Sequence, residues 1–153
     1  MTTAEGLHPV RLAGVPTDLF VTLQMHIDEL LRELEIIEMG EAAGSSAIEP
    51  RLRHIMRDLL DLYVEERQAV RAQAEQAAAL GSQRVDMEVA LPEEAVAHGE
   101  ELLRLFEQAD ELSRQGLLLT VPSTDDLAAF RRWILAEVSA QIRTKASPTP
   151  CPL

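Results

Sequence analysis

The fold is decided by residues 17–39, TDLFVTLQMHIDELLRELEIIEM. Its large apolar residues recur at alternating spacings of three and four, which is the spacing of a seam along one side of a helix. These residues are Phe20, Leu23, Ile27, Leu30, Leu34 and Ile37. Acids such as Asp28 and Glu35 fall elsewhere on the helix. The pattern predicts a long core helix with an acidic outer face.

Similar apolar seams predict three further helices. The second is expected from about residue 49 to residue 80, after the flexible stretch GEAAGSS at residues 40–46. The third opens at Pro92, since a proline followed by acids suits the first turn of a helix, and it ends near Gly116. The last helix follows Ser123, which begins an approximate capping box.

One short segment alternates in the way that is typical of extended chain, and a second is a candidate to pair with it. Apolar residues alternate with acids at residues 85–89, and residues 117–121 read LLLTV. Either the two segments form a short antiparallel pair, or both are extended connectors packed on the bundle. We predict an all-α fold, a four-helix bundle-like single domain at residues 16–143, with an N-terminal arm at residues 1–15 and a disordered tail at residues 144–153.

Charge and composition argue against several classes of function. The formal net charge is −12, which disfavours a nucleic-acid partner, because phosphate contacts need a basic surface. No stretch reaches the ~18 apolar residues of a membrane span, and the first residues lack a secretion signal, so no membrane is expected and the protein is predicted to be cytoplasmic. The single cysteine, Cys151, can close no internal disulfide.

Two histidines are candidate phosphoacceptors. His26 borders the seam of the first helix, although the lysine and small residue typical of a histidine phosphotransfer domain do not follow it. His54 has Arg51 and Arg57 one turn away on either side, where they would stabilise added negative charge. The other interpretation is that His26 is a partly buried structural histidine and that the arginines neutralise acidic helices.

Two places on the chain are candidates for protein contacts. The first is a basic patch on the second helix, formed by Arg51, Arg53, His54 and Arg57. The second surrounds Trp133, because an aromatic residue preceded by Arg131 and Arg132 suits an interface hot spot. An equal alternative is that Trp133 anchors the last helix in the core.

Signatures of catalysis and of metal binding are missing from the sequence. A di-iron bundle needs Glu-x-x-His pairs, but none of the three helical histidines has a glutamate three positions before it. There is no Gly-rich phosphate loop and no nucleophile elbow. His98 and Gly99 lie together on the third seam, which is typical of a tight helix contact with one satisfied polar side chain. We therefore predict no enzymatic activity, no metal site and no cofactor.

Two segments carry a resemblance to a known family. They are GVPTDLFVTLQMHIDELLRELEII, at residues 14–37, and LAAFRRWILAEVSAQI, at residues 127–142. Over most of residues 10–143 the chain resembles small helical proteins of actinobacteria that are associated with genes for partner-switching regulators, namely anti-sigma kinases, their antagonists and PP2C-type phosphatases. The resemblance implies a regulatory interaction protein of bacterial signalling. It carries over no functional residues, since the nucleotide-binding boxes of the kinases are missing here.

The sequence therefore supports two predictions of function. The first is a non-enzymatic regulatory module that contacts protein partners, such as partner-switching regulators, and self-associates as a homo-oligomer, because the second helix and the Trp133 region offer more apolar surface than four core seams need. The alternative is a histidine phosphotransfer-like relay through His26 or His54. A small-ligand sensor is a third class, for which no residue pattern gives evidence.

Overall fold

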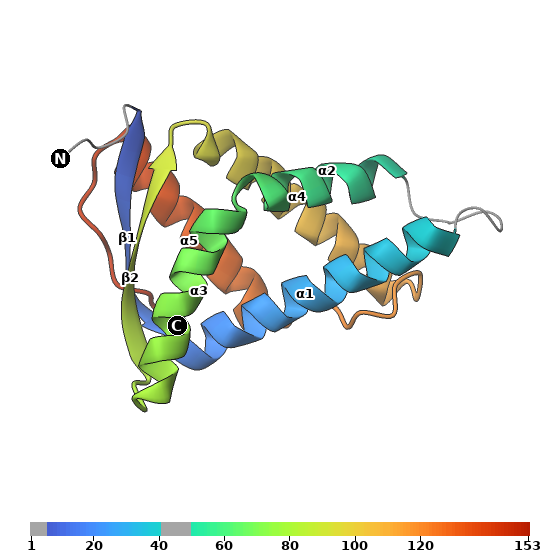
Figure 1. The fold of residues 1–153 in the computed structure, drawn as a ribbon, viewed down its shortest axis with the longest axis horizontal. Helices are drawn as coiled ribbons and strands as arrows, with labels where there is room; N and C mark the ends of the chain where they lie inside the picture. The colour runs from blue at the N-terminus through green and yellow to red at the C-terminus, as the bar shows by residue number, and fades with distance from the viewer. Residues whose placement is uncertain (1–5, 41–49) are drawn as a thin grey trace.

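The computed structural model describes residues 6–40 and 50–153, and in these ranges it contains two strands and five helices. In chain order they are β1 (Leu7–Pro16), α1 (Thr17–Gly40), α2 (Pro50–Leu62), α3 (Val64–Ala79), β2 (Arg84–Pro92), α4 (Ala95–Arg114) and α5 (Asp125–Arg143). The strands stand at one end of the molecule, and α1 and α4 extend away from them (Figure 1). The predicted all-α class is therefore wrong, because the helices are combined with a two-stranded antiparallel sheet.

β2 contains the extended segment that the sequence predicts at residues 85–89, and its partner is β1. The register places Val10 opposite Val89 and Leu12 opposite Met87. Three of these side chains, Val10, Leu12 and Met87, are buried, so this face of the sheet carries part of the core. The alternation of Val10 and Leu12 is a strand pattern in a stretch that the sequence interpretation assigned to an arm.

The segment at residues 117–121 does not pair with β2. Leu118 and Thr120 are buried, whereas the residues between and around them are exposed. Glu33 of α1 accepts hydrogen bonds from the backbone N–H of Leu119 at 2.5 Å and from that of Thr120 at 2.6 Å. The segment is therefore a connector packed on α1. Neither alternative from the sequence holds in full, because residues 85–89 are in a strand, but the partner of that strand is β1.

A bulge interrupts β1 between Leu12 and Val15. Gly14 has a positive φ of 61° there, a conformation that glycine adopts without strain. The backbone N–H of Cys151 donates to the carbonyl of Ala13 at 2.9 Å, and Cys151 is buried. The sequence predicts disorder for residues 144–153, whereas in the structure Pro150 and Cys151 lie against Ala13 and Gly14 of β1.

The first helix agrees closely with its prediction. α1 begins at Thr17 and ends at Gly40, and five of the six seam residues are buried: Phe20, Leu23, Ile27, Leu30 and Leu34. The glycine-rich exit predicted at residues 40–46 lies, beyond Gly40 itself, outside the described residues. α1 packs against α3, α5, β1 and α2, so it is the central helix of the fold.

The predicted second helix is two helices. α2 ends at Leu62 and α3 begins at Val64, with Tyr63 between them at φ −111° and ψ 26°. Figure 1 shows that the chain changes direction here, so that α3 turns toward the sheet and packs along β2. Neither proline nor glycine marks the break, which is why the apolar periodicity predicts one continuous helix.

The last two helices differ from their predictions mainly at their starts. Pro92 ends β2, and α4 begins at Ala95. The cap of α5 is Thr124, whose hydroxyl accepts from the N–H of Leu127 at 3.2 Å. Among the described helices, none combines the length and the apolarity that a membrane span requires.

Candidate functional site

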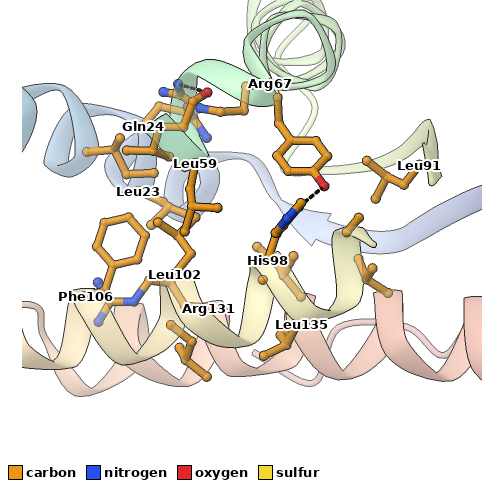
Figure 2. A pocket seen from close by; sticks show the side chains of 18 residues that line it. Leu23, Gln24, Leu59, Arg67, Leu91, His98, Leu102, Phe106, Arg131 and Leu135 are labelled. Carbon is orange, nitrogen blue, oxygen red and sulfur yellow. Dashed lines mark hydrogen bonds between the residues drawn. The ribbon is translucent and has the colours of Figure 1, made fainter. Parts of the chain in front are cut away.

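A cavity of about 250 Å³ lies between the helices. All five described helices and β2 contribute side chains to its wall, which is almost wholly apolar. Representative apolar residues are Leu23, Leu59, Leu91, Leu102, Phe106 and Leu135 (Figure 2). Concave apolar sites with a few polar groups are the usual form of a small-molecule site, so this cavity is the candidate functional site.

Tyr63 and His98 form the first polar pair at the cavity wall. The hydroxyl of Tyr63 lies 2.6 Å from Nδ1 of His98, and the two rings are in edge contact. Burial, with help from Glu94 and Glu66, raises the pKa of Tyr63. The direction of the hydrogen bond depends on which ring nitrogen of His98 carries the proton.

His98 is followed by the closest helix contact of the site. A Cβ atom at Gly99 would lie 2.8 Å from Cδ1 of Leu135 on α5, so only glycine fits without movement. The tight contact predicted from the pair His98–Gly99 is confirmed, and Tyr63 is the partner that satisfies the histidine.

Arg67 supplies a cation at the same cavity. Its guanidinium makes one long hydrogen bond, from Nη1 to the carbonyl of Leu60 at 3.4 Å, and its Nε is buried without a hydrogen-bond partner. Burial lowers the pKa of Arg67, and Arg71 lowers it further. Asp28 and Asp61 act in the opposite direction and raise it, and Arg71 contacts Asp28 at 3.2 Å. In residues 6–40 and 50–153 no carboxylate forms an ion pair with Arg67.

Gln24 of α1 is the second polar group at the cavity with unfilled hydrogen-bonding capacity. Its side chain lines the cavity, the residue is only 7% exposed, and its amide has no hydrogen-bond partner among the described residues. Figure 2 shows Gln24 and Arg67 at the same end of the cavity. The amide is not one of the fully enclosed polar groups that lack a partner, so its atoms are accessible from the cavity or from solvent.

Arg131 forms part of the wall nearest Phe106, and its charge is balanced. Its Nη2 donates to Oδ2 of Asp110 at 2.9 Å, and its guanidinium carbon lies 4.9 Å from the centre of the Phe106 ring. Ser123 donates to Asp110 through its backbone N–H at 2.9 Å and through its hydroxyl at 2.8 Å. This buried network joins α4, α5 and the connector before α5.

His26 touches the same network but does not form a catalytic triad with it. Nε2 of His26 lies 3.3 Å from the Ser123 hydroxyl and 4.0 Å from Asp110. In a triad the histidine lies between serine and carboxylate and uses both ring nitrogens, whereas here Ser123 bonds directly to Asp110. Burial first, and then Arg131, lower the pKa of His26, so its imidazole is neutral at neutral pH.

The histidines predicted as phosphoacceptors lie in different surroundings. The side chain of His26 is 12% exposed, in agreement with the interpretation of a partly buried structural histidine. The side chain of His54 is 56% exposed, and its Nε2 contacts Glu38 of α1 at 2.8 Å. Phosphorylation of either residue stays a prediction.

The predicted basic patch is divided by the fold. Arg53 is fully buried, and Arg57 forms an ion pair with Glu38, the same carboxylate that binds His54. The two hydrogen bonds, from Arg57 first and from His54, lower the pKa of Glu38. The side chain of Arg51 lies outside what the structure describes.

The three residues around Trp133 also separate. Arg131 is buried in its pair with Asp110, and Arg132 is exposed and lies 3.6 Å from Glu107. Trp133 is partly buried against the core, and its ring stacks on Phe130 with centroids 6.0 Å apart. Of the two interpretations of Trp133, this placement agrees with the anchor of the last helix.

Comparison with known proteins assigns the site to no family. No protein-family model, curated protein or solved structure matches this chain. The regulatory role implied by the actinobacterial resemblance therefore stays a prediction. Within the described ranges, no group of three or more His, Cys, Asp or Glu side chains comes together as a metal site. The function proposed below rests on the geometry of the cavity.

Three residues of the candidate site were not predicted as site residues from the sequence: Gln24, Tyr63 and Arg67. Gln24 lies one position after the seam residue Leu23, and that position on a core helix is the available signal. Arg67 stands in VEERQAVRAQ, where it looks like one member of a solvated charged face. Its inward position depends on the helix break at Tyr63.

Proposed function

We propose that this protein is a non-enzymatic binding module that accommodates a small, mostly apolar molecule in the cavity between its helices. The observation that carries the proposal is the cavity itself: its wall is almost wholly apolar, and the few polar side chains in it include Gln24, whose amide has no hydrogen-bond partner among the described residues. Because α1, α4 and α5 all contribute side chains to the cavity wall, a bound ligand would contact these three helices at once. Such an arrangement suits a sensor in a regulatory system.

The cavity volume sets the size of the ligand. An engineered cavity of about 150 Å³ holds benzene, with six carbon atoms, so about 250 Å³ corresponds to roughly ten carbon atoms. An uncharged probe of that size, decan-1-ol, tests the cavity without engaging any charge. We expect it to bind one-to-one in a calorimetric titration and to raise the melting temperature.

A matched pair of variants on α4 localises the binding. Ala95 lines the cavity and is 8% exposed, whereas Ala97 on the same helix is exposed. The ring added by Ala95→Phe occupies much of the cavity, so we expect it to remove decan-1-ol binding, while Ala97→Phe leaves binding unchanged. Wild-type protein that binds no decan-1-ol, or a folded Ala95→Phe variant that binds it like the wild type, would overturn the proposal.

Protein contacts are the second candidate function, in agreement with the regulatory module expected from the sequence. The observation that favours them is a group of exposed apolar side chains on α1 and on the connector that Glu33 holds against it. Leu119 is 93% exposed, Val121 is 71% exposed and Ile36 is 58% exposed. Exposed apolar groups of this kind suit an interface with a partner-switching regulator or with a second copy.

Self-association and a cytoplasmic location belong to the same proposal. Light scattering over a wide range of concentration is expected to give a mass larger than one chain. A mass of one chain throughout would remove self-association from the proposal and leave the ligand cavity unaffected.

A further inference from the structure

The polar groups at the cavity determine which kind of apolar ligand it takes. On the basis of the function proposed above, we infer that the ligand is an amphipathic monocarboxylate of about ten carbon atoms, whose carboxylate lies between Arg67 and Gln24 and whose apolar part fills the space toward α4 and α5.

The charge of Arg67 is the first reason for an anion. Its guanidinium lies at an apolar wall, its Nε is buried without a partner, and its single hydrogen bond to Leu60 is long at 3.4 Å. The neighbouring Arg71 is the residue that pairs with Asp28 and Glu75. A partly buried cation in apolar surroundings is costly unless an anion pairs with it. Asp28 and Asp61 favour its charge from a distance, but in residues 6–40 and 50–153 neither forms an ion pair with Arg67.

The hydrogen-bond inventory is the second reason. Arg67 can only donate, and the amide of Gln24 offers two N–H donors. A carboxylate accepts through both oxygens and donates nothing, so it complements this set, whereas an amine ligand would leave Arg67 uncompensated.

The shape of the cavity limits the rest of the ligand. The side chains of Leu102, Phe106 and Leu135 line the space away from Gln24 and Arg67 in Figure 2, and they offer only apolar contact. A volume of about 250 Å³ leaves room for a medium-length acyl chain or a fused aromatic ring, and not for a long acyl chain or a nucleotide. Decanoate and 2-naphthoate are therefore the two probes.

The electrostatics of the whole chain make the test specific. The net charge of −12 repels carboxylates at long range, so an anion binds only where a local cation outweighs that repulsion. Added salt screens the long-range repulsion more strongly than a pair inside the cavity. Decanoate bound at Arg67 should therefore keep its affinity as salt is raised, while decanoate on an exposed arginine should lose it.

The experiment compares decanoate, 2-naphthoate and decan-1-ol by calorimetry on four forms of the full chain. These are the wild type, Arg67→Gln, Arg67→Lys and Arg71→Gln, the last being a matched arginine one turn along α3. We expect the wild type to prefer decanoate to decan-1-ol by about ten- to hundredfold, the usual effect of hydrogen bonds to a charged group. Arg67→Gln should lose that preference and still bind decan-1-ol, whereas Arg71→Gln should keep it.

The remaining outcomes separate the two proposals. Equal affinity of the wild type for decanoate and decan-1-ol, or a preference that survives Arg67→Gln, overturns the carboxylate inference and leaves the cavity function standing. Binding of none of the three probes overturns both. If Arg67→Gln fails to fold, Arg67→Lys decides, because it keeps the cation and should keep part of the preference. Comparison of decanoate with 2-naphthoate then shows whether the apolar part is a chain or a ring.

Discussion

Replacing Asp110 by asparagine is expected to destabilise the fold by about 3–5 kcal/mol, the cost of removing one partner from a buried ion pair. The side chains of Arg131 and Asp110 are 5% and 6% exposed, and Nη2 lies 2.9 Å from Oδ2. At that separation the attraction is about 6 kcal/mol for an effective dielectric constant of 20, and desolvation removes part of it. Asparagine keeps the shape and the acceptor for Ser123, so the lost charge is the main change.

The assay is urea unfolding at pH 7 with a control that spans the same two helices. Glu107 of α4 pairs with Arg132 of α5 at 3.6 Å, but their side chains are 49% and 60% exposed. Exposed pairs contribute about 0–1 kcal/mol, so Glu107→Gln should cost little. Asp110→Asn and Glu107→Gln are compared by the loss in free energy of unfolding, at equal slopes of this free energy against urea concentration. If Asp110→Asn loses no more than Glu107→Gln, the assignment of Asp110–Arg131 as a buried structural pair is refuted.

The same variant has a defined pH dependence. Burial opposes ionisation of Asp110, but the hydrogen bonds from Ser123 and Arg131 outweigh it and lower the pKa below its ordinary value of 3.8. A folded-state pKa below the unfolded value means that the ionised group stabilises the fold fully above that value and loses its effect as the pH falls through the folded pKa. The stability difference between wild type and Asp110→Asn should therefore persist down to about pH 4 and shrink below it.

Two further predictions concern His26 and Gly14. The pKa of His26 is lowered from 6.5, so the unfolded chain takes up a proton at a higher pH than the folded chain, and the free energy of unfolding falls as the pH drops below that value. Between pH 7 and about pH 5 the free energy of unfolding should therefore depend less on pH in His26→Gln than in the wild type. An unchanged pH dependence would contradict the burial of His26. Gly14→Ala forces a side chain onto a φ of 61° and should lower the free energy of unfolding by about 1–2 kcal/mol, whereas no loss in thermal unfolding would contradict the bulge in β1.

The elements that the sequence predicts well are those whose own periodicity decides their structure. The bounds of α1 agree with the prediction to within one residue, because its apolar seam marks the helix and the residues of its first turn mark where it begins. Strand pairing was not predictable in the same way, since residues 7–16 and 117–121 both offer short apolar stretches to residues 85–89 and only the tertiary fold selects between them. Pro9, Gly14 and Pro16 also argue against a strand at residues 7–16, because proline and glycine are uncommon in strands, although an edge strand tolerates them.

The candidate site and the unpredicted helix break are one feature. A continuous helix over residues 49–80 would carry Arg67 along a straight axis, and nothing in the local sequence opposes that path. The break is supported by contacts made after folding, among them Tyr63 with His98 on α4 and the Arg67 guanidinium with the carbonyl of Leu60. The same two side chains line the cavity. The geometry that turns α3 toward β2 therefore also places a donor-rich wall opposite the apolar faces of α4 and α5, so a ligand that binds Arg67 acts directly on the joint between α2 and α3.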